Sequence, residues 1–342
     1  MSGGKMKSSK KISVCLPFYN IEPYIRRCLD SVLENTYQNL EVICVNDGST
    51  DGTSSLLHEY AEKDSRVIVI DQENGGVVSA RNAAISVATG DFISFIDGDD
   101  WIHRQFYEVL MSIQAKSDAD AVICSYRKIG EYTMDTELNV DEVAYAYAKE
   151  EWMLKDAHAL THVWGRLYKS DLIPKRRVDS DIAMGEDTVL NLLFLYGKKQ
   201  AKIAVTAEPL YYYFQRAESM VRTIPHAEKI KASKFLAENY SLFSISEQGA
   251  DVILQEILRT LLAYRYLEMF SPEKQDVQKV CKELYTFCTD KWCGVVGVAE
   301  RIQYQLLYHV PALYRLYRII TDPTMLDWER AEKKRQRGKR TK

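Results

Sequence analysis

Residues 40–53 read LEVICVNDGSTDGT, an apolar run of β-forming residues that ends abruptly in Asn, Asp and Gly. A short apolar run bounded by turn residues is typical of a buried strand. The same pattern recurs at 12–20 (ISVCLPFYN), 66–76 (RVIVIDQENGG) and 91–100 (DFISFIDGDD). These four segments predict four buried strands, each followed by a polar loop.

Between the predicted strands, apolar residues recur at helical spacing, as at Ile25, Cys28, Leu29 and Val32. The expected helices lie near 22–35, 53–63, 77–88 and 103–116, and a further strand is expected at 120–125. Short strands that alternate with amphipathic helices predict an α/β fold, a mostly parallel sheet with helices on both faces. Ligands bind such sheets beyond the carboxyl ends of the strands.

The polar loops therefore fall where a ligand is expected. They read Pro17-Phe18-Tyr19-Asn20, NDGSTDG (46–52), NGG (74–76) and DGDD (97–100). Asp-Gly and Asn-Gly also form ordinary turns, which is the alternative interpretation of any one loop. Four such loops at successive strand ends favour one continuous cleft.

The rest of the chain is less regular. Residues 131–151 are acidic and polar and form either an insertion or a hairpin and helix beside the cleft. A helix is expected at 186–197, strands at 201–205 and 209–214, and helices only from 226 onward. We therefore expect four parts: a basic segment (1–11), a catalytic domain (12–225), a helical extension (226–328) and a basic tail (329–342).

The formal net charge of −3 over 342 residues conceals an asymmetry. Residues 329–342 (ERAEKKRQRGKRTK) carry a net +6, and the remainder carries −9. The 7 cysteines have no paired CxxC spacing, which favours reduced thiols over a disulfide framework or a zinc site. No run of about 18 apolar residues predicts a membrane-spanning helix.

Asp97 and Asp99 follow the fourth strand, one residue apart. Two carboxylates in this arrangement can share Mn²⁺ or Mg²⁺ and leave room for substrate phosphates. Such a cation neutralises a diphosphate leaving group. Asp100 either assists this site or caps the next helix. A haloacid dehalogenase-type hydrolase is disfavoured, because its DxD follows the first strand.

Taken together, the motifs resemble the family-two inverting glycosyltransferases of GT-A fold. The resemblance covers about residues 11–220 and implies a nucleotide-sugar donor, by default a UDP-sugar, and inversion at the anomeric carbon. It rests on Leu16-Pro17-Phe18-Tyr19-Asn20, VNDGSTDGT (45–53), NGGVVSARNAA (74–84), FIDGDDW (95–101) and Gly185-Glu186-Asp187.

The resemblance also implies roles on the donor side. Pro17, Tyr19 and Asp47 match the nucleobase pocket, and a carboxylate can indeed accept a hydrogen bond from a pyrimidine N–H. Asn74 and Arg81 match positions that contact the base and the donor phosphates. Packing for Tyr19, a turn cap for Asp47 and a solvated charge for Arg81 are the structural alternatives.

Further roles carried over by the resemblance concern the reacting groups. Asp97 matches the ribose and metal-site carboxylate, and Asp99 the direct metal ligand. Trp164 matches a segment near the donor sugar, with core packing as the alternative. Arg216 and Ser219 match a late loop that closes on the diphosphate.

Inversion by direct displacement needs one base that takes the proton from the acceptor hydroxyl. The Glu186-Asp187 pair matches the family's acidic pair, so we expect Asp187 to be the base and Glu186 to position the acceptor. Both acids also suit the N-terminus of a helix dipole, and the two interpretations are compatible.

Residues 298–320 (VAERIQYQLLYHVPALYRLYRII) combine an apolar face with tyrosines and arginines, and the basic tail follows. This pattern is typical of a helix on an anionic membrane surface. The alternative is a helix packed on the catalytic domain. The membrane interpretation predicts a cytoplasmic enzyme, peripheral on the inner face of the cell membrane, that acts on a polyprenyl-diphosphate-linked glycan in surface-polysaccharide assembly.

Four other functions are considered. A catalytically silent, membrane-associated nucleotide-sugar-binding subunit is disfavoured by the intact Asp97, Asp99 and Asp187. A nucleotidyltransferase is disfavoured because residues 17–20 lack a glycine-rich phosphate loop. Nucleic-acid binding is disfavoured by the acidic body of the chain, and a processive membrane synthase by the absence of QxxRW.

Overall fold

The computed structural model describes residues 10–130, 144–148, 162–174, 182, 185–196, 202–215 and 229–239. The chain divides into two compact units, the first made of residues 1–224 with 242–244 and the second of the remaining C-terminal residues. In the second unit the described element is α8 (Lys229–Glu238), where a helix was predicted. The predicted amphipathic helix at 298–320 and the basic tail lie outside the described residues.

The first unit is built on one sheet, whose nine strands among the described residues follow the order β3-β2-β1-β4-β8-β6-β9-β5, with β7 paired to β9. Six strands run in one direction, and β5, β7 and β8 run against them. Their bounds are β1 Ile12–Phe18, β2 Leu40–Asp47, β3 Val67–Gln72, β4 Phe92–Phe95, β5 Trp101–Ile102, β6 Ala121–Ile129, β7 Ala144–Ala148, β8 Arg166–Lys169 and β9 Lys202–Phe214.

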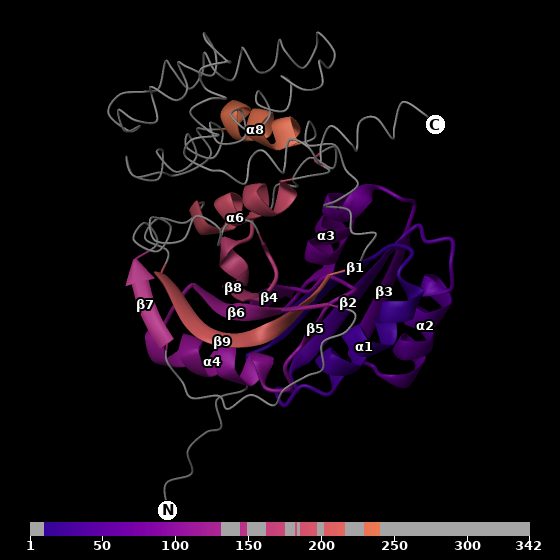
Figure 1. The fold of residues 1–342 in the computed structure, drawn as a ribbon, viewed down its shortest axis with the longest axis horizontal. Coiled ribbons are helices and arrows are strands. Elements are labelled where there is room, and N and C mark those ends of the chain that lie inside the picture. The colour runs from indigo at the N-terminus through magenta and orange to yellow at the C-terminus, as the bar shows by residue number, and fades with distance from the viewer. Residues whose placement is uncertain are drawn as a thin grey trace, which may run out of the picture. The chain divides into compact units, whose positions relative to one another are not determined.

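Helices cover both faces of this sheet, as the sequence predicts (Figure 1). α3 and α6 lie on one face, and α1, α2 and α4 lie on the other. Their bounds are α1 Glu22–Leu33, α2 Thr53–Lys63, α3 Gly76–Val87, α4 Phe106–Ser117 and α6 Glu186–Tyr196, with a short 3₁₀ helix η2 at Ser170–Leu172. Among the described residues, no helix is long and apolar enough to cross a membrane.

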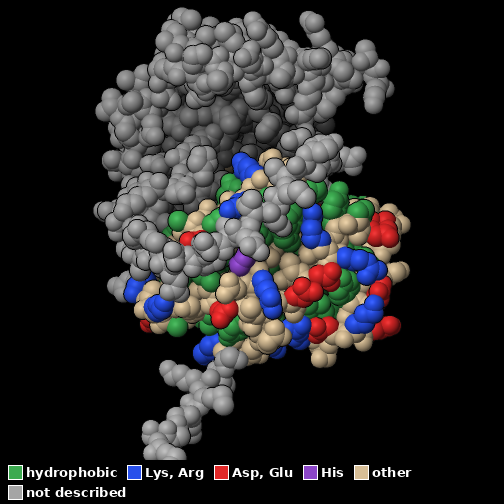
Figure 2. Space-filling model, turned by 60° about the horizontal axis from the view of Figure 1, so that its bottom comes forward, with side chains coloured by type: hydrophobic (Ala, Val, Ile, Leu, Met, Phe, Trp, Pro, Cys, Tyr) green, Lys and Arg blue, Asp and Glu red, His purple; other side chains and the backbone are tan. Residues whose placement is uncertain are grey.

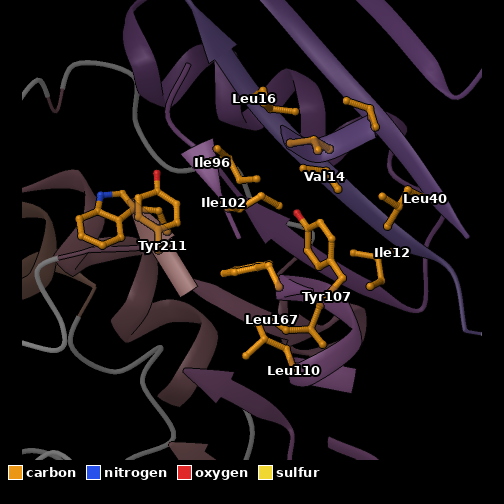
Figure 3. Packing of buried hydrophobic residues seen from close by; sticks show 14 of the residues in the cluster. Ile12, Val14, Leu16, Leu40, Ile96, Ile102, Tyr107, Leu110, Leu167 and Tyr211 are labelled. Carbon is orange, nitrogen blue, oxygen red and sulfur yellow. The ribbon is translucent and has the colours of Figure 1, made fainter. Parts of the chain in front are cut away.

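Alternation along β1 divides the core between the two faces. Ile12, Val14 and Leu16 point into one cluster, which also holds Tyr107 and Leu110 of α4 (Figure 3). The predicted apolar stripe of α1 is buried in the same cluster. Successive side chains of a strand point to opposite faces, so a fully buried strand needs apolar residues at nearly every position. This explains why β1 and β2 are mostly apolar, with Ser13 and Glu41 as buried polar exceptions near their starts.

The prediction of two strands at 201–205 and 209–214 is wrong, because β9 runs without a break from Lys202 to Phe214. Pro209 lacks an N–H for the ladder, but it lies opposite Ser125, where the β6–β9 register shifts. Irregular pairing at that point lets the strand pass through the proline. Strands β5 and β8 were not predicted, since β5 has only 2 residues and β8 reads RLYK, with a basic residue at each end instead of an apolar run.

The strand directions decide where a ligand site can form. β8 pairs antiparallel with both β4 and β6, so β6 and β9 run parallel to β1, β2 and β4. The carboxyl ends of these five strands and the amino end of β8 therefore lie along one edge of the sheet. On the face shown in Figure 2, side chains of both charge signs are interspersed over the described residues, without one basic stripe.

Candidate active site

Asp47, the last residue of β2, organises the loop that leads into α3. Its Oδ1 accepts hydrogen bonds from Gln72 Nε2 at 2.7 Å and from the Gly75 N–H at 2.9 Å, and its Oδ2 accepts one from the Gly76 N–H at 2.9 Å. Gly76 has φ +82°, a conformation that favours glycine. A carboxylate oxygen accepts two bonds, so Oδ2 keeps capacity for a ligand N–H.

The other residues predicted for the nucleobase pocket lie beside Asp47. A Cβ on Gly48 would come within 2.6 Å of the Asn74 backbone nitrogen, so the loops after β2 and β3 touch there. The loop after β1 is tied to the loop after β2, because the Thr50 N–H donates to Asn20 Oδ1 at 2.8 Å. Tyr19 is 47% exposed and Asn74 is exposed, which leaves both side chains accessible to a ligand. Pro17 is half-buried.

Arg81, on α3, lies among three carboxylates. Its Nη1 donates to Asp187 Oδ1 at 2.6 Å and lies 3.5 Å from Glu186 Oε1, and its Nη2 donates to Asp97 Oδ1 at 3.0 Å. Its side chain is only 3% exposed. The sequence predicted that Arg81 contacts donor phosphates, but here its guanidinium joins the Asp97 loop to the acidic pair at the start of α6.

Charge in this cluster is strongly unbalanced. Burial, together with the neighbouring charge of Asp187, raises the pKa of Glu186 to about 7. Burial alone would lower the pKa of Arg81, but the three carboxylates outweigh it and raise that pKa. When all are ionised, the three carboxylates of Asp97, Glu186 and Asp187 outnumber the one guanidinium of Arg81, so the cluster is net negative.

This negative excess bears on the predicted metal. A diphosphate would be repelled from the cluster unless a cation accompanied it. Asp97 and Asp99 offer the hard oxygen ligands that suit Mg²⁺ or Mn²⁺. No group of three or more His, Cys, Asp or Glu side chains forms a ready metal site in the part of the chain that the structure describes. A cation held by Asp97 and Asp99 would therefore have to take its remaining ligands from a diphosphate and water.

Asp100 anchors the acidic loop to β9. The Tyr211 hydroxyl donates to Asp100 Oδ2 at 2.6 Å, and the Phe214 N–H donates to Oδ1 at 2.7 Å. The same hydroxyl accepts a bond from the Asp97 N–H at 3.2 Å. The helix-cap alternative for Asp100 is wrong, because α4 is preceded by Gln105 at its N-cap. Burial, then the charges of the neighbouring aspartates, raise the pKa of Asp100.

Two residues that position this loop were missed from the sequence. Tyr211 lies in a run of tyrosines that carries no local signal. Arg27, on α1, donates from Nη2 to the Asp99 carbonyl oxygen at 3.1 Å, and its guanidinium lies 3.8 Å from the Trp101 ring centre and 4.5 Å from that of Phe214. These contacts fix the backbone at Asp99 through hydrogen bonding and cation–π attraction.

Trp164 lies close to both acidic groups. Its backbone bridges to Phe95 of β4, two residues before Asp97. The preceding residue, Val163, donates its N–H to Asp187 Oδ2 at 3.3 Å. The indole itself is 5% exposed and packed among aromatic rings. Arg216 and Ser219 lie outside the described residues.

Comparisons with known proteins identify the family to which this fold and its acidic cluster belong. The model of glycosyl transferase family 2 matches residues 13–171. The glycosyltransferase EpsJ of Bacillus subtilis is 30% identical over 81% of this chain and 83% of its own. The glycosyltransferase GlyA of Streptococcus pneumoniae serotype 4 is 34% identical over 62% of this chain, which spans only 32% of that longer protein.

Among solved structures, S. aureus TarS (residues 1–349) in complex with UDP-GlcNAc superimposes with a TM-score of 0.65 at 20% identity, covering 89% of this chain and 88% of that one. The fold is therefore of GT-A type, as the sequence predicted. The mostly parallel sheet, with the acidic cluster at its carboxyl edge, is an α/β architecture of this type. The chain belongs to glycosyl transferase family 2 and is a glycosyltransferase.

Proposed function

We propose that the chain transfers one sugar from a UDP-sugar, with inversion, to a hydroxyl group of a glycan in bacterial surface-polysaccharide assembly. The observation that carries the proposal is the Arg81 cluster, which brings Asp97 of the acidic loop and the Glu186-Asp187 pair to one guanidinium. Groups suited to a diphosphate-bound cation and to proton removal thus share one edge of the sheet.

In this proposal the loops after β1 and β2 bind the nucleotide. Tyr19 covers the base, Asp47 Oδ2 accepts a hydrogen bond from its N–H, and Asn74 contacts the base from the third loop. The solved complex of TarS with UDP-GlcNAc supports UDP as the nucleotide. Asp97 and Asp99 would hold Mn²⁺ or Mg²⁺, which, when bound, neutralises charge on the diphosphate.

Asp187 then acts as the general base. It takes the proton of the acceptor hydroxyl while that oxygen bonds to the anomeric carbon, and the bond from that carbon to the diphosphate breaks on the opposite face. The electron pair of that bond leaves with the nucleoside diphosphate. Because attack and departure take place on opposite faces, the configuration at the anomeric carbon is inverted. Arg81 donates a hydrogen bond to Oδ1 of Asp187 and the Val163 N–H donates one to Oδ2, so both carboxylate oxygens are held in place. Glu186 positions the acceptor.

Asp99→Ala tests the donor and metal roles together. We expect Mn²⁺ to tighten the binding of UDP-GlcNAc to the unsubstituted enzyme. In Asp99→Ala this increase in affinity should be at least about tenfold smaller, which corresponds to roughly 1.4 kcal/mol of binding free energy. Calorimetric titrations with and without Mn²⁺ measure this. Asp91→Ala is the control, because Asp91 is exposed at the opposite end of β4. Equal affinity with and without Mn²⁺ in the unsubstituted enzyme would remove the metal-ligand assignment.

The acceptor is proposed to be linked to a polyprenyl diphosphate, and the enzyme to work at the cytoplasmic face of the membrane. Support comes from the sequence of residues 298–320 and from the net +6 of residues 329–342. Neutralising the Lys and Arg residues of 329–342 to Gln in the full chain should reduce co-sedimentation with anionic liposomes, since each basic residue near the surface contributes about 1 kcal/mol. Sedimentation that is unchanged by this substitution would count against the membrane role.

A further inference from the structure

Five aromatic side chains form a cluster that the proposed mechanism does not use. Four rings are nearly parallel: His162 and Tyr211 stack on Trp164 with ring centres 4.2 and 4.4 Å away, and Tyr213 lies 5.5 Å from it. Tyr126 stands across them, at 5.0 Å from Trp164 and close to perpendicular. Such offset and edge-to-face pairs are favoured by the ring quadrupoles.

The strand directions place this cluster at the ligand edge of the sheet. Tyr126 lies in the carboxyl half of β6, opposite Tyr211 of β9, and His162 and Trp164 lie just before the amino end of β8. The sheet order puts β8, β6 and β9 on one side of β4 and puts β1, β2 and β3 on the other. The cluster and the proposed nucleotide loops therefore flank the Asp97 loop from opposite sides.

The exposed fraction of the side chains increases along the cluster, from Tyr211 to Tyr126. Tyr211 is fully buried and Trp164 is 5% exposed, so ordinary core packing accounts for both. His162 and Tyr213 are half-buried, and Tyr126 is 36% exposed although it sits against three other rings. Core packing does not account for a tyrosine held rigidly at the surface. Exposed aromatic groups on a rigid support are typical of binding sites.

The exposed end of the cluster is tied to the proposed base. The His162 carbonyl oxygen accepts a hydrogen bond from Asn191 Nδ2 at 2.7 Å, and the next residue, Val163, donates its N–H to Asp187 Oδ2. Asn191 lies one helical turn after Asp187 on α6. The backbone that carries His162 is therefore hydrogen-bonded to α6 at Asn191 and, through Val163, at Asp187.

We propose that Tyr126 and His162 form an acceptor subsite that binds a sugar ring by stacking. The inference rests on the proposed function, because it takes the acceptor to be a glycan. The C–H groups on the less polar face of a sugar carry partial positive charge, and an aromatic face carries partial negative charge, so the two attract. The subsite holds the acceptor sugar while its hydroxyl lies at Asp187.

The matched variants Tyr126→Leu and Tyr126→Phe test the ring itself. Leucine removes the ring and keeps an apolar side chain, whereas phenylalanine keeps the ring and removes the hydroxyl. The probes are methyl β-D-glucoside, methyl β-D-galactoside and methyl N-acetyl-β-D-glucosaminide, with binding followed by saturation-transfer NMR in excess UDP-GlcNAc and Mn²⁺. Ile68→Ala on β3 is the control, because Ile68 is 40% exposed on the other side of the sheet.

We expect at least one glycoside to bind the unsubstituted enzyme, and Tyr126→Leu to weaken that binding by about threefold to tenfold. Tyr126→Phe keeps most of the affinity, and Ile68→Ala keeps all of it. Three results would each overturn the subsite. They are the absence of glycoside binding, equal glycoside binding by Tyr126→Leu, and displacement of the glycoside by free uridine. The affinity for UDP-GlcNAc, measured on the same samples, tests the proposed donor separately. If UDP-GlcNAc does not bind, the donor proposal is refuted, and the glycoside result can still be interpreted.

Discussion

Replacing Asp187 with asparagine is expected to lower kcat for sugar transfer by about 10²–10⁴-fold or more, because the substitution removes the proposed general base. An amide cannot take the proton of the acceptor hydroxyl. Donor binding should persist, since Asp187 lies with Arg81 and Val163 and away from the loops proposed for the nucleotide. Release of UDP with the acceptor present measures kcat, and calorimetry measures donor affinity.

Two further variants make this prediction specific. Asp91→Asn makes the same acid-to-amide change at the opposite end of β4 and should keep full activity. Glu186→Gln should raise the KM for the acceptor more than it lowers kcat, because Glu186 is assigned to positioning. If Asp187→Asn transferred sugar at the normal rate, the base would have to be another residue.

Replacing Arg81 with methionine should lower the free energy of unfolding of the first unit by about 3–5 kcal/mol at pH 8. Removing one partner of a buried ion pair leaves the charge of the other partner uncompensated. Here Asp97, Glu186 and Asp187 would face each other without the Arg81 guanidinium that pairs with all three. Protonation relieves that repulsion, so the loss should shrink as the pH falls from 8 to 5. Urea denaturation at the two pH values measures both effects.

The matched control is Arg26→Met. Arg26 on α1 pairs with Glu59 at 3.2 Å, but its side chain is 58% exposed. Exposed pairs contribute about 0–1 kcal/mol, so this variant should be nearly as stable as the unsubstituted protein. Equal and pH-independent losses for Arg26→Met and Arg81→Met would mean that the Arg81 cluster has no special electrostatic role.

The first half of the fold could be predicted because its signals are local. β1 and β2 are apolar runs that end in Asp, Asn and Gly, and α1 carries its buried residues at helical spacing. The alternation of strands and helices predicts a mostly parallel sheet. It therefore also predicts that the loops after β1, β2 and β3 lie together at the carboxyl edge of that sheet. Short strands such as β8 gave no periodic signal, and they became visible only through their partners β4 and β6.

The candidate site was predictable as a set of residues but not as a set of contacts. Arg81 and Asp187 are 106 residues apart, and Tyr211 and Asp100 are 111 apart. No local pattern indicates that a helical arginine will leave solvent and enter a group of carboxylates. The aromatic cluster was missed for the same reason, since Tyr126, Trp164 and Tyr211 come from three separate segments and meet only through sheet pairing.

The central claim is that this edge of the sheet transfers sugar from a nucleotide donor. It is tested most directly by UDP release from UDP-GlcNAc and other common UDP-sugars, with Mn²⁺ and a bacterial cell-lipid extract. We predict release that requires the extract, yields a glycosylated lipid and disappears in Asp187→Asn. Donor binding without release from UDP-, GDP- or dTDP-sugars would contradict the account and favour a catalytically silent binding subunit.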